Sequence, residues 1–493
     1  MFTVEWGCNQ NVRSPSGFLR PVFIAGWSCI ASIALWQLHS GDTDKSAALT
    51  TAIILLASLA FSRVVLELRF NTAPMLYLAL LGLFHLGVVV PWALGIYDIS
   101  HTPGFVPYGH SRALAMITYS ILVFQLGLLT ALGGGKFQTR SIIQDEPKLE
   151  DSKVFKVGSS LFLLGSAMFV IGLVRLGSVG YDRLTYSETF RLRAESDPRF
   201  FGMGITIALI GLSLAAAGGS KQQMRITYVY TGFWFLTFFY LGFRSPAITA
   251  ALLVFAVASK KGVRWPRWAP LVAGLILLIA IPVVRVIREE PLDERSLSNS
   301  LHEMSILDGP AEMGSALRPL TETLDLIGPG NYRYGMTYLR ATKGILPNLA
   351  LRWEAPATES IDDLSPGHWV TAIVDPWAYK NHGGMGFSGV AEPYMNFGIA
   401  GVVVYFFLLA ILLVRLEQIS IRSSYSLAMW ALLVGPLMWT IRNDFKEFFR
   451  PAVWGLLCLG VIRLLSSRYT FPTWTTKGEN LRIPGKVPQT KRI

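Results

Sequence analysis

Long apolar runs without a charged residue constrain this chain more than any other feature. Segments such as "AALTTAIILLASLAF", "AITAALLVFAVAS" and "APLVAGLILLIAIPVV" alternate with short charged clusters over 493 residues. Charged residues make up only 15% of the chain, whereas soluble proteins average about 25%. Because a bilayer-spanning helix needs about 20 mostly apolar residues, the repeated runs predict an all-α, polytopic membrane protein.

The runs divide into about twelve predicted transmembrane helices, with a large helical extracytoplasmic loop between the ninth and the tenth. The predicted spans are 18–38, 47–66, 73–96, 113–132, 155–175, 203–218, 226–243, 245–259, 269–287, 396–415, 425–441 and 450–466. The predicted regions are helices 1–9 in residues 1–287, the loop in 288–395, helices 10–12 in 396–466, and a disordered cytoplasmic tail in 467–493. Loops this long are usually functional.

Lysine and arginine decide the predicted orientation, because they accumulate in cytoplasmic loops. With the amino terminus inside, the inner connections include "SRVVLELR", "SKQQMR" and "SKKGVRWPR", and the basic tail is also inside. Both termini are therefore predicted to be cytoplasmic. This rule also accounts for the net charge of +12, and no nucleic-acid-binding motif accompanies that charge. We therefore predict no nucleic-acid partner, and the three cysteines predict neither disulfides nor a metal site.

Arginines break this pattern on the predicted outer side, in strings such as "YDRLTYSETFRLRAESDPRF" and "VVRVIREEP". A guanidinium group keeps its charge and presents a fork of donors that fits phosphate. We expect the set to bind an anionic ligand in the membrane, such as a lipid-linked diphosphate. For any single arginine, the alternative is a nearby acidic residue or a lipid headgroup. The candidate diphosphate- and glycan-binding arginines are Arg191, Arg193, Arg244, Arg285, Arg288, Arg333 and Arg340.

The segment "NHGGMGFSGVAEPYMNFGIAGV" leads from the predicted loop into the tenth span. Its glycines form a pliable stretch where backbone can approach a ligand closely. Glycosyl transfer needs a carboxylate or an imidazole to accept the proton of the acceptor hydroxyl, so Glu392 and His382 are the candidate catalytic residues. Tyr394 and Asn396 are candidate glycan-binding residues. The alternatives are an arginine partner for Glu392 and a solvated loop position for His382.

Acidic residues are missing from the interior of every predicted span. Transporters coupled to protons or sodium usually place carboxylates near the middle of the membrane, so this absence argues against that class. His85, in the third predicted span, is expected to be packed and hydrogen-bonded.

Over essentially its whole length the chain resembles the O-antigen and capsule repeat-unit polymerases, the Wzy-type family. Locally the resemblance rests on "FFYLGFRSP", where Arg244 ends a span, and on "GMGFSGVAEPYMNFGIAGV", which enters a late helix. The family is also associated with an Arg-x10-Gly pattern in two outer loops. The pairs that fit are Arg191 with Gly202, Arg193 with Gly204, and Arg333 with Gly344. Chance gives as many pairs, so only their placement is informative.

The resemblance implies a membrane glycosyltransferase of the bacterial inner membrane with a GT-C-like helical fold. It would pass the growing chain from its undecaprenyl diphosphate to the next lipid-linked unit on the outer side, without a metal or other cofactor. The expected partners are undecaprenyl-diphosphate-linked oligosaccharide, membrane lipids and a chain-length regulator protein. An O-antigen ligase with the same donor, a lipid-linked oligosaccharide flippase or transporter, and a membrane scaffold are the alternatives.

Overall fold

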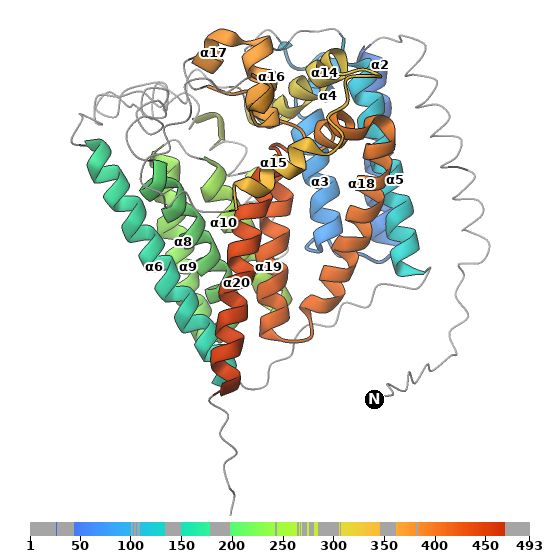
Figure 1. The fold of residues 1–493 in the computed structure, drawn as a ribbon. Coiled ribbons are helices and arrows are strands. Elements are labelled where there is room, and N and C mark those ends of the chain that lie inside the picture. Colours follow the sequence, from blue (N-terminus) through green and yellow to red (C-terminus); the bar gives the residue numbers. More distant parts are fainter. Residues whose placement is uncertain are drawn as a thin grey trace, which may run out of the picture.

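All the regular secondary structure in the residues that the computed structural model describes is helical (Figure 1). These residues are 26, 44–99, 102, 105, 109–133, 149–177, 198–241, 244–263, 266, 268, 274–275, 281–283, 305, 307–345, 361–380 and 383–468. The longer helices are α2 (Asp44–Val64), α3 (Ala73–Leu86), α5 (Ser111–Leu132), α6 (Leu149–Gly177), α8 (Pro198–Gly218), α9 (Lys221–Tyr240), α10 (Arg244–Lys260), α18 (Ala391–Ser420), α19 (Ser424–Trp439) and α20 (Lys446–Arg468). The short ones are α4 (Val89–Ala93), α13 (Asp308–Met313), η3 (Gly314–Ala316), α14 (Leu317–Leu326), α15 (Met336–Lys343), η4 (Ile361–Asp363), α16 (Pro366–Val374) and α17 (Pro376–Lys380).

Six of the described helices, α2, α5, α6, α8, α18 and α20, are long and apolar enough to cross a membrane. Three shorter apolar helices, α3, α10 and α19, lie among them. The prediction of an all-helical, polytopic membrane protein is therefore confirmed at this level. The count of twelve spans stays a prediction, because 18–38 and 269–287 lie mostly outside the described residues.

The short helices α13 to α17 cover one end of the bundle, which we call the loop end (Figure 1). At this end α14 packs against α5 and α18, and α15 packs against α20. Helices α8, α10, α18 and α20 begin at the loop end, whereas α3, α6 and α19 end there. Helices α6, α8, α9 and α10 form one side of the bundle, and α2, α3, α5 and α18 form the other, with α19 and α20 between them.

Glycines on facing sides of α6 and α8 bring these two helices into backbone contact. Gly158 of α6 faces Gly211 of α8, and Gly165 of α6 faces Gly204 of α8. The two glycines of each helix are seven residues apart in the sequence. A Cβ at Gly211 would lie 2.2 Å from the Phe162 nitrogen, which leaves no room for any side chain. A spacing of seven returns to the same helix face after two turns, and small residues let membrane helices approach closely.

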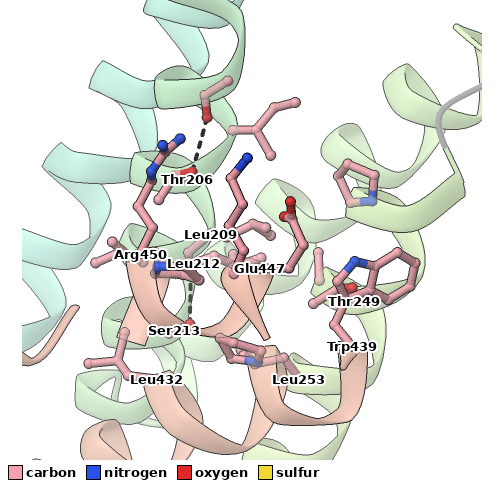
Figure 2. A pocket seen from close by; sticks show the side chains of 18 residues that line it. Thr206, Leu209, Leu212, Ser213, Thr249, Leu253, Leu432, Trp439, Glu447 and Arg450 are labelled. Carbon is pink, nitrogen blue, oxygen red and sulfur yellow. Dashed lines mark hydrogen bonds between the residues drawn. The ribbon is translucent and has the colours of Figure 1, made fainter. Parts of the chain in front are cut away.

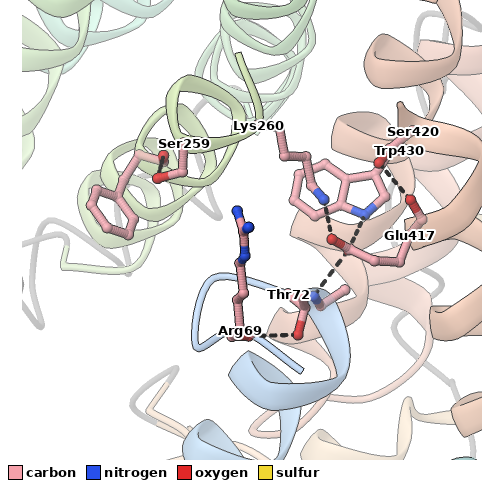
Figure 3. A network of polar contacts seen from close by, with 9 residues as sticks. Arg69, Thr72, Ser259, Lys260, Glu417, Ser420 and Trp430 are labelled. Carbon is pink, nitrogen blue, oxygen red and sulfur yellow. Dashed lines mark hydrogen bonds and ion pairs between the residues drawn. The ribbon is translucent and has the colours of Figure 1, made fainter. Parts of the chain in front are cut away.

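A buried ion pair joins four helices at the end opposite the loop end (Figure 3). The Glu417 carboxylate pairs with the Lys260 ammonium, and both side chains are at most 2% exposed. The other Glu417 oxygen accepts hydrogen bonds from Trp430 Nε1 and from the backbone N–H of Ala73, each at 3.1 Å. Ala73 begins α3, so Glu417 satisfies a backbone donor that no carbonyl of that helix can reach. The network therefore connects α3, α10, α18 and α19.

The tenth span was expected over 396–415, but α18 extends from Ala391 to Ser420. Glu392 and Glu417 therefore lie inside the helix, near its two ends, and both are buried. The Glu417 carboxylate is stable there because it is paired with Lys260 and hydrogen-bonded, as buried charges in membrane helices generally are. Glu392 is hydrogen-bonded to Thr337 and to the Phe445 N–H.

We predict that Gly211→Ala destabilises the protein, because its methyl group would overlap the α6 backbone. Overpacking of this kind costs about 1–3 kcal/mol, which thermal unfolding in detergent detects as a lowered midpoint. Gly232→Ala in α9 is the matched control, since no atom lies within 4 Å of its Cβ position. Equal midpoints for the two variants would contradict the close packing of α6 on α8.

Candidate functional site

A kink interrupts α18 shortly after it begins. Phe397 (φ −140°, ψ 15°) and Gly398 (φ 63°, ψ −150°) depart from helical geometry. The positive φ at Gly398 favours glycine, and a Cβ there would lie 2.7 Å from the Tyr332 hydroxyl oxygen. Glycine is therefore required at this position. The kink leaves the preceding carbonyls without their helical partners, and buried carbonyls need other donors.

The segment before α15 supplies those donors. The N–H of Arg333 donates to the Met395 carbonyl at 2.9 Å, and the N–H of Tyr334 donates to the Asn396 carbonyl at 3.0 Å. The N–H of Gly335 donates to the Asn396 side-chain oxygen at 2.9 Å. Residues 333–335 are thus fixed to the start of α18, and α15 follows directly.

A polar network of Thr337, Glu392, Asn396 and the Phe445 N–H joins three elements at this point. Glu392 is only 3% exposed. One of its carboxylate oxygens accepts from the Thr337 hydroxyl at 2.8 Å, and the other accepts from the Phe445 N–H at 2.7 Å. Asn396 Nδ2 donates to the Thr337 oxygen at 2.6 Å. The network therefore holds the carboxylate in one orientation between α15, α18 and the turn before α20.

Two further side chains, those of Asp444 and Tyr338, lie near this carboxylate. Asp444 is also buried and lies close enough to interact with Glu392 electrostatically. Burial raises the pKa of the Tyr338 hydroxyl well above its usual value, and the nearby charge of Glu392 adds to the rise. Tyr338 therefore stays protonated and can act only as a neutral hydrogen-bonding group.

The glycine-rich segment that precedes α18 lies against the end of α19. The N–H groups of Phe387 and Gly389 donate to the carbonyls of Arg442 and Ile441, at 2.8 and 3.1 Å. Ser388 meets His85 Nε2 at 2.8 Å, and both residues are fully buried. The expectation for His85 is thus confirmed. The close backbone approach expected here is present, but it is to another part of the chain.

A cavity of about 370 Å³ opens between α8, α10, α19 and α20 (Figure 2). Leu209, Leu212, Leu253 and Leu432 line its deeper part. The hydroxyls of Thr206 and Ser213 donate to carbonyls of their own helix, at 3.0 and 2.7 Å, so this part offers mainly apolar contacts. Lys446, Glu447 and Arg450 line the cavity at the loop end.

The mouth of this cavity is suited to an anion. Helices α8, α10 and α20 all begin beside it, and a helix N-terminus carries unsatisfied N–H groups and a partial positive charge. Lys446 directly follows Phe445, whose N–H binds the Glu392 carboxylate. Arg450 Nε donates to the Gly344 carbonyl at 2.8 Å, which connects the cavity wall to the end of α15. The cavity and the polar network are therefore neighbours.

The structure gives the candidate residues different surroundings. Glu392 and Asn396 meet in the polar network. Tyr394 is 5% exposed, and its ring packs edge-on against Tyr332, with centroids 6.1 Å apart. Arg244 is the first residue of α10, two positions before Pro246, which lines the cavity. The candidates that lie outside the described residues are Arg191, Arg193, Arg285, Arg288 and His382.

Arg333 and Arg340 each pair with an aspartate of η4. Arg333 Nη2 lies 2.7 Å from Asp362 Oδ1, and Arg340 Nη2 lies 2.7 Å from Asp363 Oδ1. The hydrogen bond and the charge of Arg333 hold the pKa of Asp362 below its usual range. Arg333 also stacks on Trp369, 5.1 Å from the ring centroid. These arginines therefore have carboxylate partners within the chain.

Thr337, Asp444 and Lys446 belong to the site but were not singled out from the sequence. The one available signal was the string "RNDFKEFFR", which concentrates charges between two apolar runs. Within the described ranges, no three histidine, cysteine, aspartate or glutamate side chains converge as metal ligands.

These features define a polytopic membrane protein that places a cation-rimmed apolar cavity beside a buried carboxylate. The family model for O-antigen polysaccharide polymerase Wzy matches residues 24–471, and the chain belongs to this family. Comparison with curated proteins and with solved structures gives no match. The protein is therefore a multi-pass membrane enzyme of lipopolysaccharide biosynthesis that polymerises polyprenyl-diphosphate-linked repeat units. The family confirms the resemblance and favours polymerase over ligase, transporter or scaffold.

Proposed function

We propose that this polymerase transfers glycan at the loop end, that this end faces the periplasm, and that both termini are cytoplasmic. One observation carries the proposal: the cavity mouth with Lys446 and Arg450 adjoins the network that holds Glu392. A lipid-linked diphosphate has an anionic head and an apolar tail, and this cavity has a cationic mouth and an apolar interior. The orientation also agrees with the positive-inside distribution of lysine and arginine.

The donor diphosphate binds at the cavity mouth in this proposal. Lys446 and Arg450 of the cavity lining supply positive charge, and the three helix starts add backbone donors. Arg244, at the start of α10, is assigned to the same anion. Glu447 lies at the same mouth, but its single negative charge does not cancel the charges of Lys446 and Arg450, so the net charge stays positive. The volume falls within the range of ordinary ligand pockets, so it accommodates the diphosphate with the first isoprene units. The rest of the polyprenyl chain extends into the bilayer.

The reaction exchanges one bond to the anomeric carbon for another. The bond from that carbon to the diphosphate oxygen breaks, and the diphosphate leaves with the bonding electron pair. The cations at the cavity mouth stabilise its developing negative charge. The acceptor hydroxyl oxygen, at the non-reducing end of the next unit, bonds to the anomeric carbon, and its proton passes to Glu392. Each Glu392 oxygen accepts one hydrogen bond now, so lone pairs remain for this role.

The remaining candidates complete the proposed site. Arg191, Arg193, Arg285 and Arg288 bring further charge to the diphosphate and glycan, and His382 is the second candidate base. Asn396 orients Glu392 through Thr337. The buried Tyr394 packs behind the residues that bind the glycan. Arg333 and Arg340 can bind substrate after exchanging their aspartates, since surface ion pairs are worth only about 0–1 kcal/mol. We further propose a GT-C-like fold, a location in the bacterial inner membrane, and a chain-length regulator as partner.

Arg244→Ala and Arg288→Ala are each predicted to reduce chain extension strongly, so that long chains disappear from the polysaccharide ladder. Loss of a charged hydrogen-bond donor costs about 1.5–3 kcal/mol, or roughly ten- to a hundredfold in rate. Polysaccharide ladders from a complemented deletion strain measure the effect, and membrane fractionation checks insertion. Arg415→Ala, an exposed arginine near the other end of α18, is the control and should leave the ladder unchanged. Normal ladders from both test variants would remove the diphosphate-binding role.

Glu392→Gln is predicted to lower polymerisation by at least about a hundredfold, the usual minimum contribution of a general base. Glutamine keeps the shape and one acceptor oxygen but cannot take up the proton. The assay is chain extension by purified protein in liposomes that contain lipid-linked repeat units. Glu322→Gln in α14, which is partly exposed, serves as the control. Wild-type rates for Glu392→Gln would exclude it as the base.

A further inference from the structure

Tyr334 combines a backbone conformation that favours glycine with an exposed aromatic ring. Its φ is 45°, and within the described ranges Glu67 is the other non-glycine residue with positive φ. The left-handed region is unfavourable for a residue with a bulky side chain. The ring is nevertheless 70% exposed, so burial of this side chain does not offset the strain. Strain of this kind persists where the surroundings enforce it, and such positions cluster at functional sites.

The start of α18 enforces this conformation. The Tyr334 N–H donates to the Asn396 carbonyl at 3.0 Å, and the residues on either side are bound to Met395 and to the Asn396 side chain. Asn396 Nδ2 in turn donates to Thr337, whose hydroxyl donates to Glu392. The backbone that carries the exposed ring is therefore fixed to the same residues that orient the proposed catalytic base.

The residues on either side of Tyr334 in the chain take part in aromatic and polar contacts. Tyr332 supports the ring edge-on, with ring centroids 6.5 Å apart. The adjacent Arg333 stacks on Trp369 and pairs with Asp362, so guanidinium and carboxylate groups lie alongside aromatic rings. Aromatic faces pack against the C–H faces of pyranose rings, while such polar groups bind hydroxyls.

We propose that Tyr334 is the stacking residue for the acceptor saccharide, the non-reducing-end sugar whose hydroxyl attacks the donor. The inference rests on the proposed function and adds a substrate-binding residue to it. A tyrosine that only anchors the protein at the membrane surface needs exposure, but it needs neither a left-handed backbone nor attachment to the network around Glu392. These two observations favour the saccharide over the lipid as the occupant.

The test compares Tyr334→Gly and Tyr334→Phe in purified protein with two separate probes. The probes are the repeat-unit oligosaccharide released from its lipid, and undecaprenyl diphosphate alone. Tyr334→Gly removes the ring and suits the positive φ, so its thermal midpoint should not fall. Its affinity for the oligosaccharide should drop by about tenfold, the order expected for one aromatic contact, while its affinity for undecaprenyl diphosphate stays within about twofold. Tyr334→Phe should bind both probes as the wild type does.

Tyr240→Gly is the matched control, because Tyr240 is an exposed tyrosine at the end of α9 with an ordinary helical backbone. It should bind both probes normally. Unchanged oligosaccharide affinity in Tyr334→Gly would overturn the proposal, and so would a selective loss of undecaprenyl diphosphate, which would assign the ring to the lipid. The proposed function fails separately, if Glu392→Gln polymerises normally in the liposome assay, whatever the Tyr334 variants bind.

Discussion

The backbone hydrogen bonds between the kink of α18 and residues 333–335 determine the arrangement of the whole loop end. Glycine at 398 permits the kink, and the kink releases two carbonyls that only an incoming segment can satisfy. That segment leads directly into α15, which carries Thr337 to the Glu392 carboxylate. The turn before α20 completes the site from the other side, through the Phe445 N–H. One interruption of a helix thus fixes the backbone of Tyr334 and the Glu392 carboxylate, and α15 continues from there to Gly344, which binds Arg450 of the cavity wall.

Charged side chains are arranged differently at the two ends of the bundle. At the far end, Glu417 and Lys260 neutralise each other and leave no net charge, as expected for ions buried away from water. At the loop end, Lys446 and Arg450 lie at a cavity mouth beside three helix N-termini, where positive potential accumulates. Close packing of α6 on α8 and the far-end network fix the helices. Of these two sites, the loop-end cavity combines positive charge with an apolar interior, as an anionic amphiphile requires.

Hydropathy predicted the apolar helices that the structure describes, because the bilayer favours long helices of apolar composition. It also drew attention to Glu392 and Asn396, as polar residues at the mouth of a late span, and the structure joins them. It could not reveal the pairing of Arg333 with Asp362, which lies 29 residues away across the loop, because only the tertiary fold brings the two together. The kink at Phe397 and Gly398 could not be predicted from hydropathy either, because composition does not determine the φ and ψ angles of single residues. The predicted tenth span ended before Glu417, because a charged residue usually marks the end of a span. Here the charge is buried and paired with Lys260, so the helix continues past it.

The central claim is that the donor diphosphate occupies the cavity mouth next to Glu392. A cryo-electron microscopy structure in lipid nanodiscs with a non-hydrolysable undecaprenyl-diphosphate analogue tests it most directly. The account predicts diphosphate density between Lys446, Arg450 and the start of α10, with the first isoprene units against Leu253 and Leu432. Diphosphate density on Arg333 and Arg340 in place of their aspartates, with the cavity free of lipid, would contradict it.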